Sequence, residues 1–146
     1  ARSADVLIVD QLGQQNEKLA SDAKSYFEIL EKGDTLNEIN PFLNSLFNPN
    51  ILPFLTSYLA YNPSDIYQRV EAPVLVISGK ADVQVPVEDA EALFELSPNS
   101  ELVLIGTMNH VLKSVRSEQE NFLSYGNPEL PLHESLVPII HSFLNK

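Results

Sequence analysis

Three short runs of apolar residues stand out along the chain. Residues 4–10, 73–78 and 101–105 are rich in Val, Ile and Leu, and none of the three alternates between apolar and polar positions. Such runs are typical of parallel strands that helices cover on both faces. The pattern therefore predicts an α/β fold. Because three strands are few for such a sheet, and the first comes directly at the start, we interpret the chain as a piece of a longer protein.

About sixty residues of helical character separate the first two runs, which is too many for a single crossover helix. Apolar residues recur at helical spacing between residues 19 and 30, and Gly33 suits the end of that helix. Residues 39–61 are again apolar, but their Pro and Asn residues break the pattern into short helices. We expect a helical insertion over residues 14–69.

Two further helices are predicted in the second half of the chain. Pro86 suits a first helical turn, and Glu88 and Asp89 favour the positive end of the helix dipole, so a helix should cover residues 86–96. From residue 131 onward helical spacing returns, and Pro138 should kink this helix or lie in its first turn. The resulting order of strand, loop, helix and strand is that of an α/β sheet.

Composition and charge narrow the class of protein. The chain has 146 residues, of which 44% are hydrophobic, enough for one globular core. A net charge of -11 disfavours nucleic acid and anionic lipid as partners. The absence of Cys excludes disulfides and thiolate metal sites. No apolar run reaches the ~20 residues of a transmembrane helix, and no signal peptide is recognisable. The compartment stays open, with the cytoplasm favoured.

The loops after the second and third apolar runs each carry one ionisable residue. Residues 79–86 read GKADVQVP and contain Asp82, while residues 106–112 read GTMNHVL and contain His110. Parallel sheets place functional residues in loops beyond the carboxyl ends of their strands, so both side chains are candidates for a functional site at that edge of the sheet. A neutral histidine oriented by a carboxylate can take a proton from a nucleophile and return it to a leaving group.

In this region the sequence resembles the C-terminal part of the α/β-hydrolase superfamily. In that family an apolar strand leads into Gly-x-x-Asp with Val-Pro shortly afterwards, and the next strand leads to the histidine, often as Asn-His. Here Gly79, Asp82 and the pair at residues 85–86 fill the first pattern, and Asn109 and His110 fill the second. The resemblance implies that Asp82 is the acid and His110 the base of a Ser-His-Asp triad, with a hydrogen bond between the two side chains.

The family's nucleophile lies on Gly-x-Ser-x-Gly, and the chain contains no such pentapeptide. Ser78 lacks the preceding glycine and lies at the end of the acid's strand, so we do not assign it as the nucleophile. The resemblance implies that the serine and the oxyanion hole lie outside this chain. It also implies that residues 4–10 are the strand before a helical cap, and that the insertion over residues 14–69 is that cap.

Other ionisable residues have competing interpretations. Asp10 also ends an apolar run, and some α/β-hydrolases place the acid at this strand, so Asp10 is the alternative acid. Without that role it is a loop residue. His133 and His141 are predicted to lie on the last helix as surface residues.

The resemblance implies a serine hydrolase that acts on a carboxylic ester or thioester with an apolar acyl group, without cofactor or metal. The aromatic residues within residues 39–61 could line an acyl cavity or belong to the core. A peptidase of the same superfamily needs the same two residues. A non-catalytic binding module on the same scaffold is the alternative from another class. The exposed edge of the strand at residues 4–10 predicts self-association of the fragment.

Overall fold

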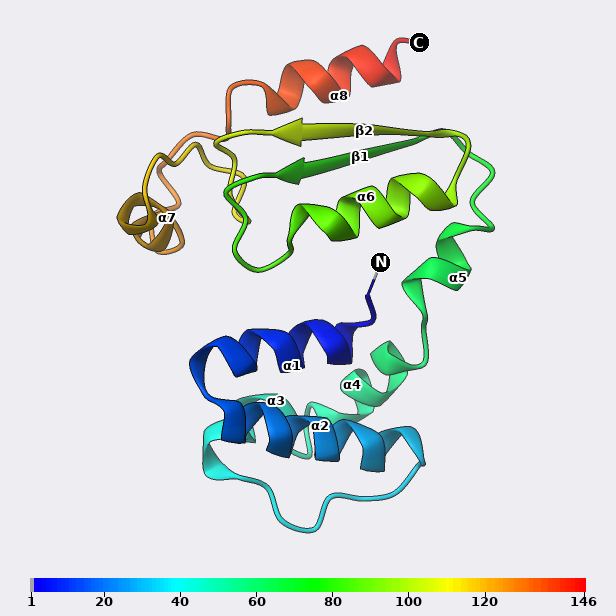
Figure 1. The fold of residues 1–146 in the computed structure, drawn as a ribbon, viewed down its shortest axis with the longest axis vertical. Coiled ribbons are helices and arrows are strands. Elements are labelled where there is room, and N and C mark those ends of the chain that lie inside the picture. Colours follow the sequence, from blue (N-terminus) through cyan, green and yellow to red (C-terminus); the bar gives the residue numbers. More distant parts are fainter. Residues whose placement is uncertain (1) are drawn as a thin grey trace. The chain divides into compact units, whose positions relative to one another are not determined.

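The computed structural model describes residues 2–146, which form two compact units (Figure 1). The unit Arg2–Ile66 is built from helices. The unit Tyr67–Lys146 contains a parallel two-stranded sheet with helices around it. The protein is therefore mixed α/β, in agreement with the predicted class.

The helical unit begins with two helices joined by a single residue. Helix α1 (Ala4–Gln15) packs against helix α2 (Glu17–Glu31). Between them, the side-chain oxygen of Asn16 accepts hydrogen bonds from the backbone amides of Lys18 and Leu19 at 3.0 and 3.1 Å. These bonds satisfy two of the free amides at the start of α2. Short helices follow, namely η1 (Pro41–Leu43), α3 (Asn44–Phe47), α4 (Leu52–Leu59) and α5 (Pro63–Tyr67).

The strand predicted at residues 4–10 is wrong, because these residues lie in α1. Ile8, Val9 and Leu12 are at helical spacing and pack against the core of the helical unit, whereas Val6 is exposed. A short apolar run fits a buried strand and a buried helix equally well. Here the side chains that partly cover the run come from neighbouring helices, and the only strands among the described residues lie elsewhere.

Apolar side chains from α2 and from the short helices form the core of the helical unit. Phe27 of α2 meets Phe47 of α3 with 5.0 Å between ring centroids, in an edge-to-face arrangement that suits two aromatic rings. Gly33 follows α2 with φ 78°, and its amide donates to the Leu30 carbonyl at 3.0 Å. The predicted helix through residues 19–30 and its glycine end are confirmed. The buried core consists of Ala23, Phe27, Leu30, Leu43, Phe47 and Leu55.

The sheet unit contains the two strands that bear the predicted site. Strand β1 (Val74–Gly79) pairs in parallel with strand β2 (Ser100–Ile105), so that Gly79 lies opposite Ile105. Helix α6 (Val87–Leu96) forms the crossover between them and contacts both strands. Both strands and this helix are confirmed to within a residue at each end. The loops after β1 and β2 therefore start at the same edge of the sheet.

Helices α6 and α8 (Leu136–Leu144) lie on opposite sides of the two strands (Figure 1). Leu136 and Ile139 of α8 pack with Ile77 of β1 and Val103 of β2. The last helix starts later than predicted from residue 131, and Pro138 lies in its first turn. Helix α7 (Glu118–Ser124), which the hydrophobic pattern did not predict, lies beyond the carboxyl ends of the strands.

Candidate active site

The loops after β1 and β2 approach each other closely where the strands end. A β-carbon at Gly79 would lie 1.9 Å from the carbonyl oxygen of Met108, so only glycine fits here. The amide of Lys80 donates to the Ile105 carbonyl at 2.9 Å, and the amide of Ala81 donates to the Met108 carbonyl at 3.1 Å. These contacts fix the acid loop against the histidine loop.

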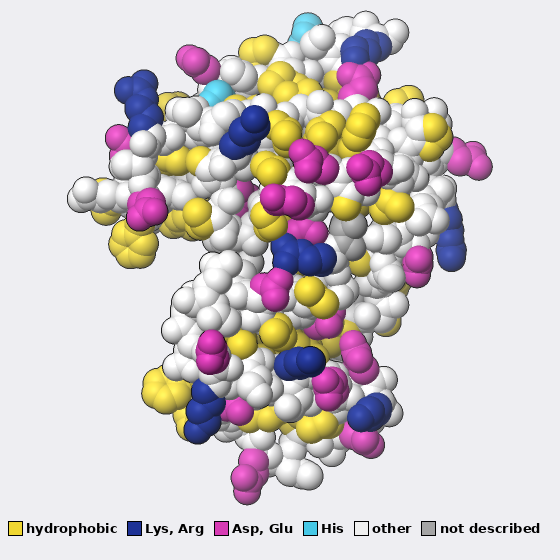
Figure 2. All heavy atoms as spheres, viewed as in Figure 1, with side chains coloured by type: hydrophobic (Ala, Val, Ile, Leu, Met, Phe, Trp, Pro, Cys, Tyr) yellow, Lys and Arg dark blue, Asp and Glu magenta, His cyan; other side chains and the backbone are white. Residues whose placement is uncertain are grey.

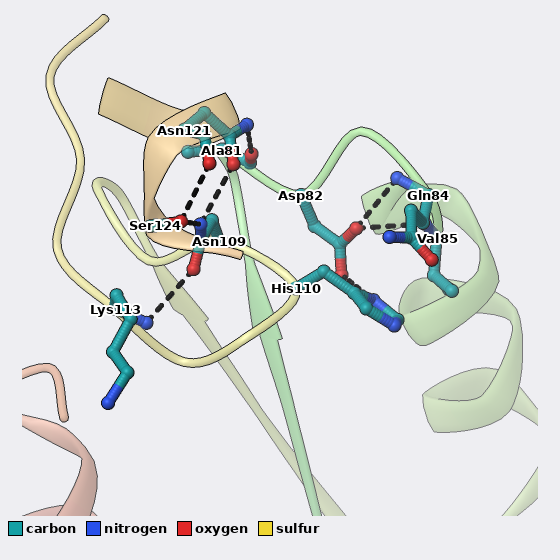
Figure 3. Close-up of polar contacts among 9 residues, drawn as sticks. All are labelled: Ala81, Asp82, Gln84, Val85, Asn109, His110, Lys113, Asn121 and Ser124. Carbon is teal, nitrogen blue, oxygen red and sulfur yellow. Dashed lines mark hydrogen bonds and ion pairs between the residues drawn. The ribbon is translucent and has the colours of Figure 1, made fainter. Parts of the chain in front are cut away.

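Asp82 lies in the tight turn after β1, and its carboxylate is bound at both oxygens (Figure 3). Oδ1 accepts hydrogen bonds from the amides of Gln84 and Val85 at 2.8 and 2.9 Å. Oδ2 lies 3.0 Å from Nδ1 of His110. The predicted contact between Asp82 and His110 is therefore present. The two backbone amides hold the carboxylate in one orientation.

The hydrogen bond to Asp82 selects one tautomer of the His110 ring. An ionised carboxylate only accepts hydrogen bonds, so Nδ1 of the imidazole carries the proton that it donates to Asp82. In the neutral ring this arrangement leaves the second nitrogen, Nε2, as the one that can accept a proton. The His110 side chain is 39% exposed, while that of Asp82 is 11% exposed. The base is thus accessible while the carboxylate that orients it is sheltered.

The turn that carries His110 has an uncommon backbone conformation. Leu112 has φ 62°, which costs a residue with a β-carbon about 1–2 kcal/mol. Its amide donates to the Asn109 carbonyl at 3.0 Å, and its carbonyl accepts from the His133 amide at 2.8 Å, so neighbours on both sides hold this conformation. Such constrained residues gather at functional sites, where the surrounding structure enforces them.

A pocket of about 200 Å³ lies beside the Asp82–His110 pair. Its walls are mainly apolar, and Asp89 of α6 adds a buried carboxyl group. From the sequence Asp89 is only a residue that favours the start of a helix, and its place beside the site was not predicted. This volume suits a small group rather than a polymer. The lining residues include Val76, Val85, Ala90, Leu93, Met108 and Leu112.

Asp10, the alternative acid, belongs to the helical unit. Asp10 was expected at the end of a strand and instead lies in α1, where it is exposed and pairs with Arg2. The His110 ring contacts the carboxylate of Asp82, the first choice for the acid. Ser78 belongs to β1 and lines the pocket.

The prediction that His133 is a surface residue of the last helix is wrong. His133 precedes α8 and is 8% exposed. Its Nδ1 accepts from the amide of Ser135 at 3.2 Å, and its Nε2 lies 3.0 Å from the hydroxyl of Thr107 in the loop after β2. The ring is buried because it joins the segment before α8 to that loop. His141 lies on α8 and is exposed, as predicted.

Comparisons with protein-family models, with curated proteins and with solved structures give no match. Within residues 2–146, the His, Asp and Glu side chains form no group of three or more that could hold a metal ion. The same residues include no helix long and apolar enough to cross a membrane.

Proposed function

We propose that this chain supplies the acid and the base of a Ser-His-Asp triad in an α/β-hydrolase. The observation that carries the proposal is the hydrogen bond of 3.0 Å between Asp82 Oδ2 and His110 Nδ1. It joins loops at the carboxyl ends of two adjacent parallel strands, where α/β proteins place functional residues. The supporting amides at Asp82 Oδ1 leave the other carboxylate oxygen for the histidine.

In this proposal His110 acts as general base and then as general acid. Nε2 takes the proton of the serine hydroxyl as its oxygen attacks the acyl carbon, and then gives the proton to the departing alcohol or thiol. Water repeats the sequence on the acyl-enzyme and releases the acid. Asp82 stabilises the imidazolium ion that forms in each step. The serine lies outside this chain, which has no Gly-x-Ser-x-Gly.

The proposed substrate is a small ester or thioester with an apolar acyl group, because the pocket beside the pair has mainly apolar walls. We assign the unit Arg2–Ile66 to the cap insertion on its helical content and on its place in the chain ahead of β1. Nucleic acid is not a proposed partner. The net charge is -11, and Asp and Glu side chains are spread over both units on the face in Figure 2.

A serine-reactive fluorophosphonate probe tests the proposal on the full-length protein. Such a probe labels a serine that an adjacent base activates. Labelling should be lost in His110→Ala and retained in His141→Ala, which removes an exposed histidine from the same unit. The 146-residue chain alone should stay unlabelled. Full labelling of a folded His110→Ala variant would remove His110 from the mechanism.

A further inference from the structure

Helix α7 brings one polar side chain between the two loops of the candidate site. Ala81 directly precedes Asp82, and Asn109 directly precedes His110. The side-chain amide of Asn121 donates from Nδ2 to the Ala81 carbonyl at 3.0 Å and accepts at Oδ1 from Asn109 Nδ2 at 2.8 Å (Figure 3). A single amide group therefore bridges the acid loop and the histidine loop.

This bridge is buried, and its donors and acceptors are matched. Asn109 is 1% exposed and Asn121 is 7% exposed. Asn109 also donates to Ser124 Oγ at 2.7 Å and accepts at Oδ1 from the Lys113 amide at 2.9 Å. The Ser124 hydroxyl in turn donates to the Asn121 carbonyl at 2.7 Å. Reversing either amide would place donor against donor and acceptor against acceptor, so the network admits one arrangement.

The peptide group between Ala81 and Asp82 is bound on both sides. Its carbonyl oxygen accepts the hydrogen bond from Asn121, and its amide donates to the Gly79 carbonyl at 3.1 Å. The plane of this peptide sets the direction in which the Asp82 side chain leaves the backbone. If the bond from Asn121 is lost, the plane can rotate and move the carboxylate away from His110.

We infer that Asn121 is a positioning residue for the Asp82–His110 pair, an inference that rests on the proposed function. Asn121 itself does not contact the reacting atoms. It acts through Ala81 and Asn109, whose separation it fixes. Catalysis by proton transfer needs this precision, because a misplacement of ~1 Å can cost about 100-fold in rate.

The variant Asn121→Asp tests the bridge with little change in shape. It keeps the oxygen that accepts from Asn109 but puts a second oxygen against the Ala81 carbonyl in place of a donor. The matched control is Asn127→Asp, the same chemical change at an exposed position after α7. There the Oδ1 atom of Asn127 accepts a hydrogen bond from the Glu129 amide at 3.1 Å, and a carboxylate oxygen can accept the same bond.

The first measurement is the proton NMR spectrum of the 146-residue chain. A histidine Nδ1 proton that is bonded to a carboxylate resonates far downfield, and the signal needs no serine. With three histidines in the chain, His110→Gln identifies it. We expect the signal in the parent chain and in Asn127→Asp, and its loss in Asn121→Asp, with circular dichroism showing a folded chain. If Asn121→Asp does not fold, Asn121→Ala replaces it, since it removes both bonds without adding a charge.

The second measurement is the ester turnover of the full-length protein. Asn121→Asp should lower kcat by about 100-fold with little change in KM, because misplaced groups slow the chemical step. In a protein that already carries Asp82→Asn, the change Asn121→Asp should lower kcat by less than about 3-fold, since the interaction that Asn121 positions is already absent.

Two results would overturn the inference. One is an unchanged downfield signal in folded Asn121→Asp. The other is an equal loss of kcat from Asn121→Asp with and without Asp82→Asn, which is the behaviour of a residue that only stabilises the fold. If the full-length protein shows no serine chemistry, the proposed function fails. The NMR measurement on the chain still decides whether Asn121 positions the pair.

Discussion

Replacing Gly79 by alanine should push apart the two loops that carry Asp82 and His110. The added β-carbon would lie 1.9 Å from the Met108 carbonyl oxygen and 2.5 Å from its carbonyl carbon. Carbon atoms in contact normally stay about 3.5–4.0 Å apart, so the strand end must move by more than ~1 Å. Both atoms belong to the backbone, and therefore no side-chain rotation can relieve the clash.

The expected destabilisation follows from the contacts that such a movement breaks. Overpacking of this kind costs about 1–3 kcal/mol. The bonds from Lys80 to Ile105 and from Ala81 to Met108 cross the same gap, and the loss of one of them adds roughly 1 kcal/mol. We expect Gly79→Ala to destabilise the sheet unit by about 2–4 kcal/mol and to weaken the bond between Asp82 and His110.

Amide hydrogen exchange in β1 and β2 measures this effect within the sheet unit alone. Since 1.4 kcal/mol corresponds to a factor of ten, protection should fall by roughly 30-fold to 700-fold. Gly106→Ala is the matched control, because Gly106 directly follows β2 and a β-carbon there meets no atom within 4 Å. Equal protection in the two variants would refute the argument from the close approach at Met108.

Three further predictions concern the candidate site and the surface of the chain. In the full-length protein, Asp82→Asn should lower kcat for a p-nitrophenyl acyl ester by ~10⁴-fold, and adding His110→Ala should cost little more, because triad residues act as a unit. In urea unfolding of the chain, His133→Ala should lower the free energy of unfolding by about 1–3 kcal/mol, because it leaves buried polar groups without partners. His141→Ala should change that free energy by no more than ~0.5 kcal/mol. Finally, residues 4–10 are helical and offer no strand edge for self-association. Within residues 2–146, however, β1 pairs only with β2, so the chain should still self-associate in sedimentation experiments, and a monomer at high concentration would contradict this.

The sequence was informative where a strand passes directly into its functional loop. The apolar run before Gly79 and the run before Gly106 could be recognised from their composition, and a parallel pair then brings the following loops to one edge. This placement, together with the resemblance that pairs an acid with a histidine in these two loops, made the contact between Asp82 and His110 predictable without coordinates. The contact supports the roles proposed for these residues, and the assays above test the roles themselves.

The predictions that were wrong or missing share one physical cause. The local sequence allows more than one structure, and contacts with residues distant in the sequence decide which one forms. Residues 4–10 have the composition of a strand, but Ile8 and Val9 pack, partly buried, against the helical core as parts of α1. His133 looked like a polar residue of a surface helix, and it is buried because it binds Thr107. Asn121 lies in a seven-residue helix with little apolar periodicity, so only its contacts reveal its place beside the site.

The division of the chain at residues 66 and 67 separates the protein into two uninterrupted stretches of sequence. Within residues 2–146 the polypeptide passes from one unit to the other only once, in the short helix α5. The pair Asp82–His110 and the residues that hydrogen-bond to it or brace it, including Asn109 and Asn121, all come after this passage. The helical unit can therefore change in evolution without a break in the segment that carries Asp82, His110 and the residues that brace them.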